Sequence, residues 1–153
     1  MRDSLASLIY QLAKELDIDL QVDVKGGCSL LFQEKITLQM ELSKDETELI
    51  ILSFAATLPP GKFREKVLLE ALKINNRYPR FAPLGFFDQT NTLTLYHKVS
   101  FDDLNGKKLA SLLAEIIDLS LLWNKAIDSN LVSPLELQMK QTKEKPTVFD
   151  IKQ

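Results

Sequence analysis

A strict alternation of apolar and polar residues runs along residues 36–42, with the sequence ITLQMEL. The residues that fall on one side of such an extended chain are all apolar: Ile36, Leu38, Met40 and Leu42. This pattern is typical of a strand in an antiparallel sheet that has one covered face and one face toward water. The chain must therefore build a sheet and pack something against one face of it.

Further strands are expected on both sides of this one in the sequence. Residues 28–33 (CSLLFQ) form a short apolar run after a turn at Gly26-Gly27. Residues 47–58 (TELIILSFAATL) are apolar on both faces at their centre, so we place this strand in the middle of the sheet or beneath a helix. Residues 84–99 (LGFFDQTNTLTLYHKV) are predicted to form a hairpin that turns at residues 89–91.

Three segments show the period of amphipathic helices. The first follows a possible cap at Asp3 or Ser4, and its apolar stripe is Leu5, Leu8, Ile9, Leu12 and Leu16. The second covers about residues 62–77, with the stripe Phe63, Val67, Ala71, Ile74 and Tyr78, widened by Leu68, Leu69 and Leu72. The third covers about residues 107–129, after Asp102 or Asn105, and is apolar over more than half of its circumference.

The order of these segments predicts an α+β fold, in which a single antiparallel sheet has flanking helices in the order α-β-β-β-α-β-β-α. The chain has 153 residues, of which 45% are hydrophobic, enough for the core of one domain. We assign residues 1–130 to that domain. Residues 131–153 are polar and rich in Lys, with Pro134 and Pro146, and we expect a poorly ordered C-terminal tail there.

Composition argues against several classes of protein. With 19 basic and 21 acidic residues the net charge is −2, and no basic face for nucleic acid is expected. The single cysteine, Cys28, cannot form an internal disulfide, which favours a reducing, cytoplasmic compartment. Asp3, Lys14 and Glu15 interrupt the apolar pattern of the N-terminus, so we expect no signal peptide. No run approaches the ~20 apolar residues of a membrane span.

The sequence offers no active site. His97 is the only histidine and has no acid or base close to it in the sequence, and one His with one Cys cannot build a zinc site. The segment LPPGKF at residues 58–63 lacks the spaced glycines of a phosphate-binding loop. Asp102-Asp103 is more typical of a helix cap than of a catalytic acid pair. We therefore expect no enzymatic activity, no metal and no cofactor.

What the sequence offers instead is apolar surface. The second helix and the LGFF strand after it carry more apolar residues than one contact with a sheet requires. A self-complementary interface between two copies of the chain explains this excess better than a well-filled core.

Over about residues 4–128 the chain resembles the class I type III secretion chaperones, the family of the Tir chaperone and the Yersinia Yop chaperones. The segments that carry the resemblance follow the first helix in order: FAATLPPG, LLEALKINN, APLGFFDQ, and TLTLYHKVS running into Asp-Asp and a long helix. The pattern L-L-x-A-L-x-x-N at residues 68–75 lies in its densest part. Two features depart from the family: the basic, Pro-rich segment NRYPRFAP at residues 76–83 and the longer tail after residue 130.

The resemblance implies a homodimer that binds the N-terminal region of one or more secreted effector proteins and keeps that region unfolded and ready for secretion. By position, the residues implied at the dimer interface are Leu68, Leu72, Leu84 and Phe86. Those implied in effector binding are Leu8, Leu12, Leu30, Phe32, Ile36, Leu38 and Met40. The secretion ATPase is a further implied partner, whereas neither nucleic acid nor a membrane is expected.

Three other functions compete with this one. A dimeric adaptor or regulatory protein with the same fold, acting outside secretion, makes the same sequence predictions, and only the identity of the partner would separate the two. An enzyme with an unrecognised pocket would need a cleft lined by titratable groups. A nucleic-acid binder would need a basic face, but residues 1–130 hold 15 basic and 18 acidic residues, a net charge of −3.

Overall fold

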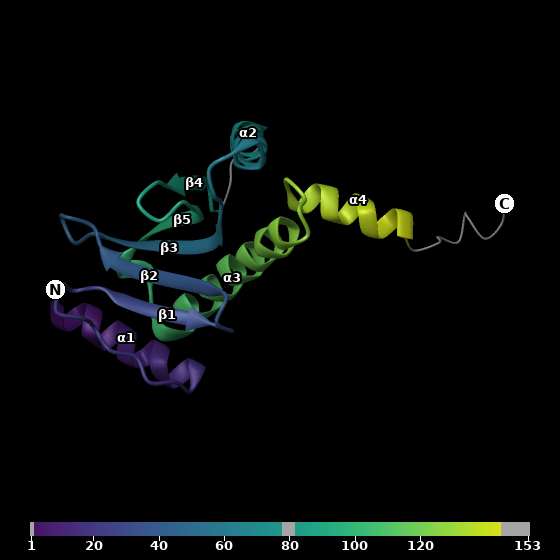
Figure 1. The fold of residues 1–153 in the computed structure, drawn as a ribbon. Helices are drawn as coiled ribbons and strands as arrows, with labels where there is room; N and C mark the ends of the chain where they lie inside the picture. Colours follow the sequence, from purple (N-terminus) through teal and green to yellow (C-terminus); the bar gives the residue numbers. More distant parts are fainter. Residues whose placement is uncertain (1, 78–81, 145–153) are drawn as a thin grey trace.

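A five-stranded sheet with helices packed on one of its faces forms the body of the molecule, as Figure 1 shows. The computed structural model describes residues 2–77 and 82–144. Its elements, in chain order, are α1 (Arg2–Leu16), β1 (Cys28–Phe32), β2 (Ile36–Leu42), β3 (Glu48–Thr57), α2 (Lys62–Arg77), β4 (Leu84–Phe87), β5 (Thr92–Ser100), a 3-10 turn (Phe101–Asp103), α3 (Gly106–Asp128) and α4 (Pro134–Glu144). The predicted α+β class, with one antiparallel sheet, is confirmed.

The strands follow the order β1-β2-β3-β5-β4, and every neighbouring pair is antiparallel. β3 lies at the centre, where its two-sided apolar sequence is expected to place it. β1 and β4 are the two edge strands. The alternation that predicts β2 is observed directly, because Ile36, Leu38 and Met40 are fully buried while Thr37 is exposed.

The core consists of two clusters of buried side chains on the helix-covered face of the sheet. The first joins α1, the N-terminal half of α3 and strands β1 to β3. The second joins α2, β4, β5 and Trp123 of α3. Between them the hydroxyls of Ser53 on β3 and Ser120 on α3 form a buried hydrogen bond of 2.6 Å. α3 thus belongs to both clusters, and each fully buried Leu or Ile in them contributes about 1.5–3 kcal/mol.

The start of α3 is fixed by its cap and by a close contact with α1. Asn105 is the cap residue, and its side chain accepts a hydrogen bond of 2.9 Å from the Lys108 N–H. Asp102 and Asp103, predicted as possible caps, lie instead in the preceding 3-10 turn. The Gly106 N–H donates to Gln11 Oε1 on α1 at 3.0 Å, so the two helices meet at a residue without a side chain.

Two sequence expectations need correction. α1 begins at Arg2, so Asp3 and Ser4 lie within the helix and are not its cap residues. No helix is predicted after residue 129, whereas the structure has α4 at Pro134–Glu144. Leu137 and Ser133 are buried in this region, and the Val132 N–H donates to Glu136 Oε2 at 3.0 Å. The boundary of the domain at residue 130 stays a prediction.

Two smaller points complete the fold. Tyr78, predicted as the last member of the α2 stripe, and Pro146 of the predicted tail lie outside the described residues. Among the helices that the structure describes, none has the length and apolar character needed to cross a membrane.

Candidate binding surface

The one cysteine of the chain lies in the core of the fold. Cys28 is buried, and burial, together with the nearby negative charge of Asp23, raises the pKa of its thiol. A thiol of this kind is a packing residue and not a nucleophile. Within residues 2–77 and 82–144, no group of three or more His, Cys, Asp or Glu side chains is placed to hold a metal ion.

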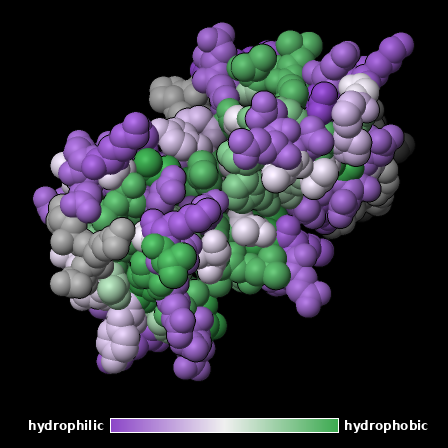
Figure 2. Space-filling view, turned by 60° about the vertical axis from the view of Figure 1, so that its left-hand side comes forward, coloured by the Kyte–Doolittle hydropathy of each residue, from purple (hydrophilic) through white to green (hydrophobic). Residues whose placement is uncertain are grey.

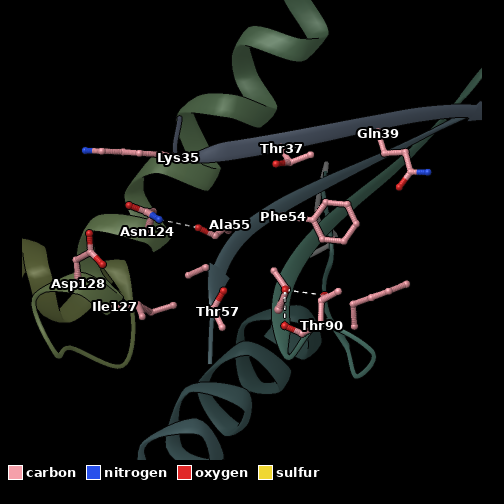
Figure 3. Close-up of a pocket in the computed structure, with 13 residues that line it drawn as sticks. Lys35, Thr37, Gln39, Phe54, Ala55, Thr57, Thr90, Asn124, Ile127 and Asp128 are labelled. Carbon is pink, nitrogen blue, oxygen red and sulfur yellow. Dashed lines mark hydrogen bonds between the residues drawn. The ribbon is translucent and has the colours of Figure 1, made fainter. Parts of the chain in front are cut away.

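A cavity of about 680 Å³ lies where the end of β3 meets α3 and the β4–β5 turn. Figure 3 shows its lining, in which the Asn124 side chain donates to the Ala55 carbonyl oxygen at 2.9 Å. The Thr90 and Thr92 hydroxyls lie 2.8 Å apart and bond to each other. The Asn124 carboxamide and the two threonine hydroxyls are therefore engaged in contacts within the protein.

A smaller and more apolar cavity, of about 340 Å³, lies between the end of α1, the edge strand β1 and the middle of α3. Its apolar lining residues are Leu16, Ile18, Leu30, Leu31, Phe32, Ala110, Leu113, Ala114 and Ile117. Only Gln33 and Asp118 add polar side chains. Small binding sites in proteins are generally concave and mostly apolar, with few polar groups, and this cavity matches that description.

The apolar cavity lies beside the outer edge of β1, which pairs with no further strand among residues 2–77 and 82–144. β1 pairs with β2 on one side only, because it is the first strand of the sheet. An extended segment of another protein can pair with such an edge and place alternate side chains in adjacent pockets. The cavity and the β1 edge together form a surface suited to an extended apolar peptide.

The residues predicted for effector binding divide into two groups. Leu30 and Phe32 are half-buried and line the apolar cavity. The others are buried in the core of the described chain: Leu8, Leu12, Ile36, Leu38 and Met40. Such side chains support the surface from beneath and do not form it in this conformation. Sequence reasoning missed the cavity residues of α3, and it did not assign to the site either Leu16, the last member of the first helical stripe, or Ile18, which follows α1.

The residues predicted for the dimer interface also differ in exposure. Leu72 on α2 is 65% exposed and the neighbouring Leu69 is 52% exposed. Leu68 and Phe86 are half-buried, and the Arg64 guanidinium covers the Phe86 ring at 5.2 Å from its centroid. Leu84 is buried in the second core cluster. The free apolar surface of α2 is therefore centred on Leu69 and Leu72.

Figure 2 shows apolar residues gathered in several patches on one face of the molecule, with hydrophilic side chains between and around them. The large apolar side chains that remain exposed come from several elements, including α1, β1, α2, α3 and α4. Large exposed apolar patches often mark a site of contact with another protein.

Comparison with known protein families identifies the family of this chain. The family model described as "Tir chaperone protein (CesT) family" matches residues 7–123, which is more than half of the chain and extends from α1 into α3. The chain belongs to this family. Its members are chaperones, so the resemblance noted in the sequence is confirmed. α4 lies beyond the matched residues.

Solved structures of the same architecture agree with the CesT assignment. A chain in the crystal structure of the ExsC–ExsE complex has a TM-score of 0.66 and 20% identity, covering 81% of this chain and 92% of that one. One in the HopA1–SchA chaperone–effector complex has a TM-score of 0.65 and 15% identity, covering 82% and 96%. One in the complex of the Yersinia pestis type III secretion chaperone SycH with a fragment of YscM2 has a TM-score of 0.60 and 18% identity, covering 76% and 96%.

At these identities the similarity to solved structures shows the fold of this CesT-family chain and not its partners. A comparison with curated protein sequences gave no match.

Proposed function

We propose that this CesT-family chain is a type III secretion chaperone that binds the N-terminal region of an effector protein in extended form. The observation that carries the proposal is the apolar cavity beside the unpaired edge of β1. Membership of the family supports it, as does the likeness in fold to a chain of a chaperone–effector complex. A protein that acts by binding in this way needs no catalytic group.

An extended segment on this surface stays unfolded because its apolar side chains are held by the chaperone and not by each other. Ordering a flexible segment on binding costs about 2–5 kcal/mol of the gross interaction energy. Apolar burial offsets this cost at about 25 cal/mol per Å². Several side chains seated in and around the cavity are therefore enough to retain the segment without energy from ATP.

The proposal extends to a homodimer, in which the exposed leucines of α2 meet across a two-fold axis. It places the protein in the cytoplasm, where effectors await secretion. The secretion ATPase remains a further partner implied by the family resemblance.

The test compares two substitutions that add the same charge at sites of equal exposure. Ile18 lines the apolar cavity and is 40% exposed, whereas Leu122 on α3 is 41% exposed and lines none of the described cavities. We expect Ile18→Asp to reduce capture of the effector at least tenfold, because a carboxylate would be desolvated in the cavity. Leu122→Asp is expected to leave capture unchanged. Tagged wild-type and variant proteins would be recovered from the native cells, and the bound protein identified and quantified by mass spectrometry.

The identity of the captured protein decides between the proposed functions. One dominant secreted protein, protected from limited proteolysis only in its N-terminal region, supports the chaperone. A partner held through a folded domain, or one that Ile18→Asp and Leu122→Asp retain equally, would contradict the proposed site and favour an adaptor.

A further inference from the structure

The last turn of α2 carries a side chain that bonds to the edge of the sheet. Asn75 Nδ2 donates to the Leu84 carbonyl oxygen at 2.7 Å, and Asn75 Oδ1 accepts from the Leu84 N–H at 3.0 Å. Both main-chain groups of one β4 residue are thus bound by a single carboxamide. The carboxamide has one donor and one acceptor side by side, as a peptide group of a neighbouring strand would.

The pairing of β4 with β5 shows which way these main-chain groups point. Antiparallel strands alternate between residues that exchange hydrogen bonds with the partner and residues whose groups point away from it. The Tyr96 N–H donates to the Pro83 carbonyl oxygen at 3.0 Å, next to the register pair of Leu84 with Leu95. Leu84 and Phe86 therefore direct their N–H and C=O groups outward, whereas Gly85 and Phe87 direct theirs toward β5.

The outer edge of a sheet presents N–H and C=O groups that can pair with a strand of another molecule. β4 has four residues, so only Leu84 and Phe86 can bond to an added strand. The Asn75 side chain bonds to both outward main-chain groups of Leu84. Only the N–H and C=O of Phe86 are then left, which are too few to pair with a second strand. Proteins commonly protect exposed sheet edges against such association by covering them.

α2 is also held at its other end, which keeps Asn75 in register with β4. Arg64 Nη1 donates to Asn91 Oδ1 in the β4–β5 turn at 3.0 Å, and the same guanidinium covers the Phe86 ring. Between these points Val67 and Ala71 are buried against β4 and β5 in the second core cluster. The helix therefore follows the hairpin along its length, and Asn75 is a positioned side chain and not a mobile one.

We propose that Asn75 closes the β4 edge to strand pairing with a second copy of this chain. Copies are then left to associate through side chains, and β1 remains the edge that is open to an incoming strand. This inference rests on the hydrogen bonds of Leu84 and holds whether or not the chain binds an effector.

The experiment compares Asn75→Ala with Asn76→Ala, its exposed neighbour on the same helix. Sedimentation velocity over a range of protein concentrations would measure assembly size, and amide hydrogen exchange would follow Leu84, Gly85 and Phe87. We expect Asn75→Ala to form assemblies larger than those of the wild type as concentration rises. Its Leu84 amide should exchange about tenfold faster, the factor for losing one hydrogen bond, when measured at concentrations below assembly. Asn76→Ala is expected to match the wild type in both respects.

The amides of Gly85 and Phe87 show whether Asn75→Ala still folds, because their bonds go to β5. If they stay protected and the variant keeps the wild-type assembly size at all concentrations, the proposal is overturned. The wild-type chain supplies a second test that needs no variant: a Leu84 amide that exchanges freely while Gly85 and Phe87 are protected would also overturn it.

Discussion

The turn between β2 and β3 is organised around a single carboxylate, that of Asp45. Its Oδ1 accepts hydrogen bonds from the hydroxyls of Ser43 and Thr47, each at 2.7 Å, and from the Thr47 N–H at 3.1 Å. These bonds favour the charged form, and they lower the pKa of Asp45 to about 2, with the Thr47 hydroxyl as the largest cause. The Asp45 carboxylate thus ties together the two ends of the turn that joins β2 to β3.

The lowered pKa of Asp45 predicts how stability changes with pH. A carboxyl whose pKa is lower in the folded than in the unfolded chain stabilises the fold above the unfolded value, near 3.8, and loses that effect as pH falls toward about 2. We expect the melting temperature of the wild type to exceed that of Asp45→Asn at pH 6, and the difference to shrink between pH 4 and 2. Thermal unfolding followed by circular dichroism measures this. A gap that stays constant over that range, or a carboxyl that titrates near 4 by NMR, would show that the turn lacks these bonds.

At the scale of elements, the contact between α1 and α3 depends on Gly106. A Cβ at this position would lie 2.7 Å from the carbonyl carbon and Cβ of Gln11. Because the obstruction is main chain, the helices would have to separate. A matched glycine is available at Gly85 in β4, where a Cβ would meet nothing within 4 Å.

We expect Gly106→Ala to destabilise the protein by about 1–3 kcal/mol, the usual cost of overpacking a close contact. Gly85→Ala is expected to change stability by less than about 1 kcal/mol, because the added methyl group has room. Urea unfolding of both variants measures the difference. Equal stability of the two would mean that α1 and α3 do not meet at this glycine.

The helices and strands also show which features of the fold sequence patterns can predict. The alternation in β2 and the two-sided apolar run of β3 predict both strands and their places, because an amphipathic pattern directly reflects one covered face. α4 escapes such reasoning because Pro134 suggests a break, yet proline is well suited to the first position of a helix. The apolar stripe of α1 predicts burial correctly at Leu8 and Leu12, but a stripe cannot tell a residue in the core from one that lines a surface cavity. That distinction depends on which elements meet at the edge of β1.

At the scale of the whole molecule, α2 is a helix that carries apolar residues on two sides. α2 buries Val67 and Ala71 against the sheet and leaves Leu69 and Leu72 exposed. In a two-fold dimer each exposed leucine is buried twice, once in each copy. Fully burying a leucine contributes about 1.5–3 kcal/mol. Because Leu72 is 65% exposed, this position adds about 2–4 kcal/mol over the two copies of the proposed dimer.

The last prediction concerns that association. We expect Leu72→Asp to weaken dimer formation by a hundredfold or more, because the leucine contacts are lost and two carboxylates would face each other. The fold should persist, since Leu72 is 65% exposed in the single chain. Light scattering coupled to gel filtration would report a monomer for this variant and a dimer for Ser111→Asp, which adds the same charge at an exposed position of α3. If Leu72→Asp remains a dimer at the same concentration, the copies meet through another surface, and the open face of α2 would then be free to contact a different protein.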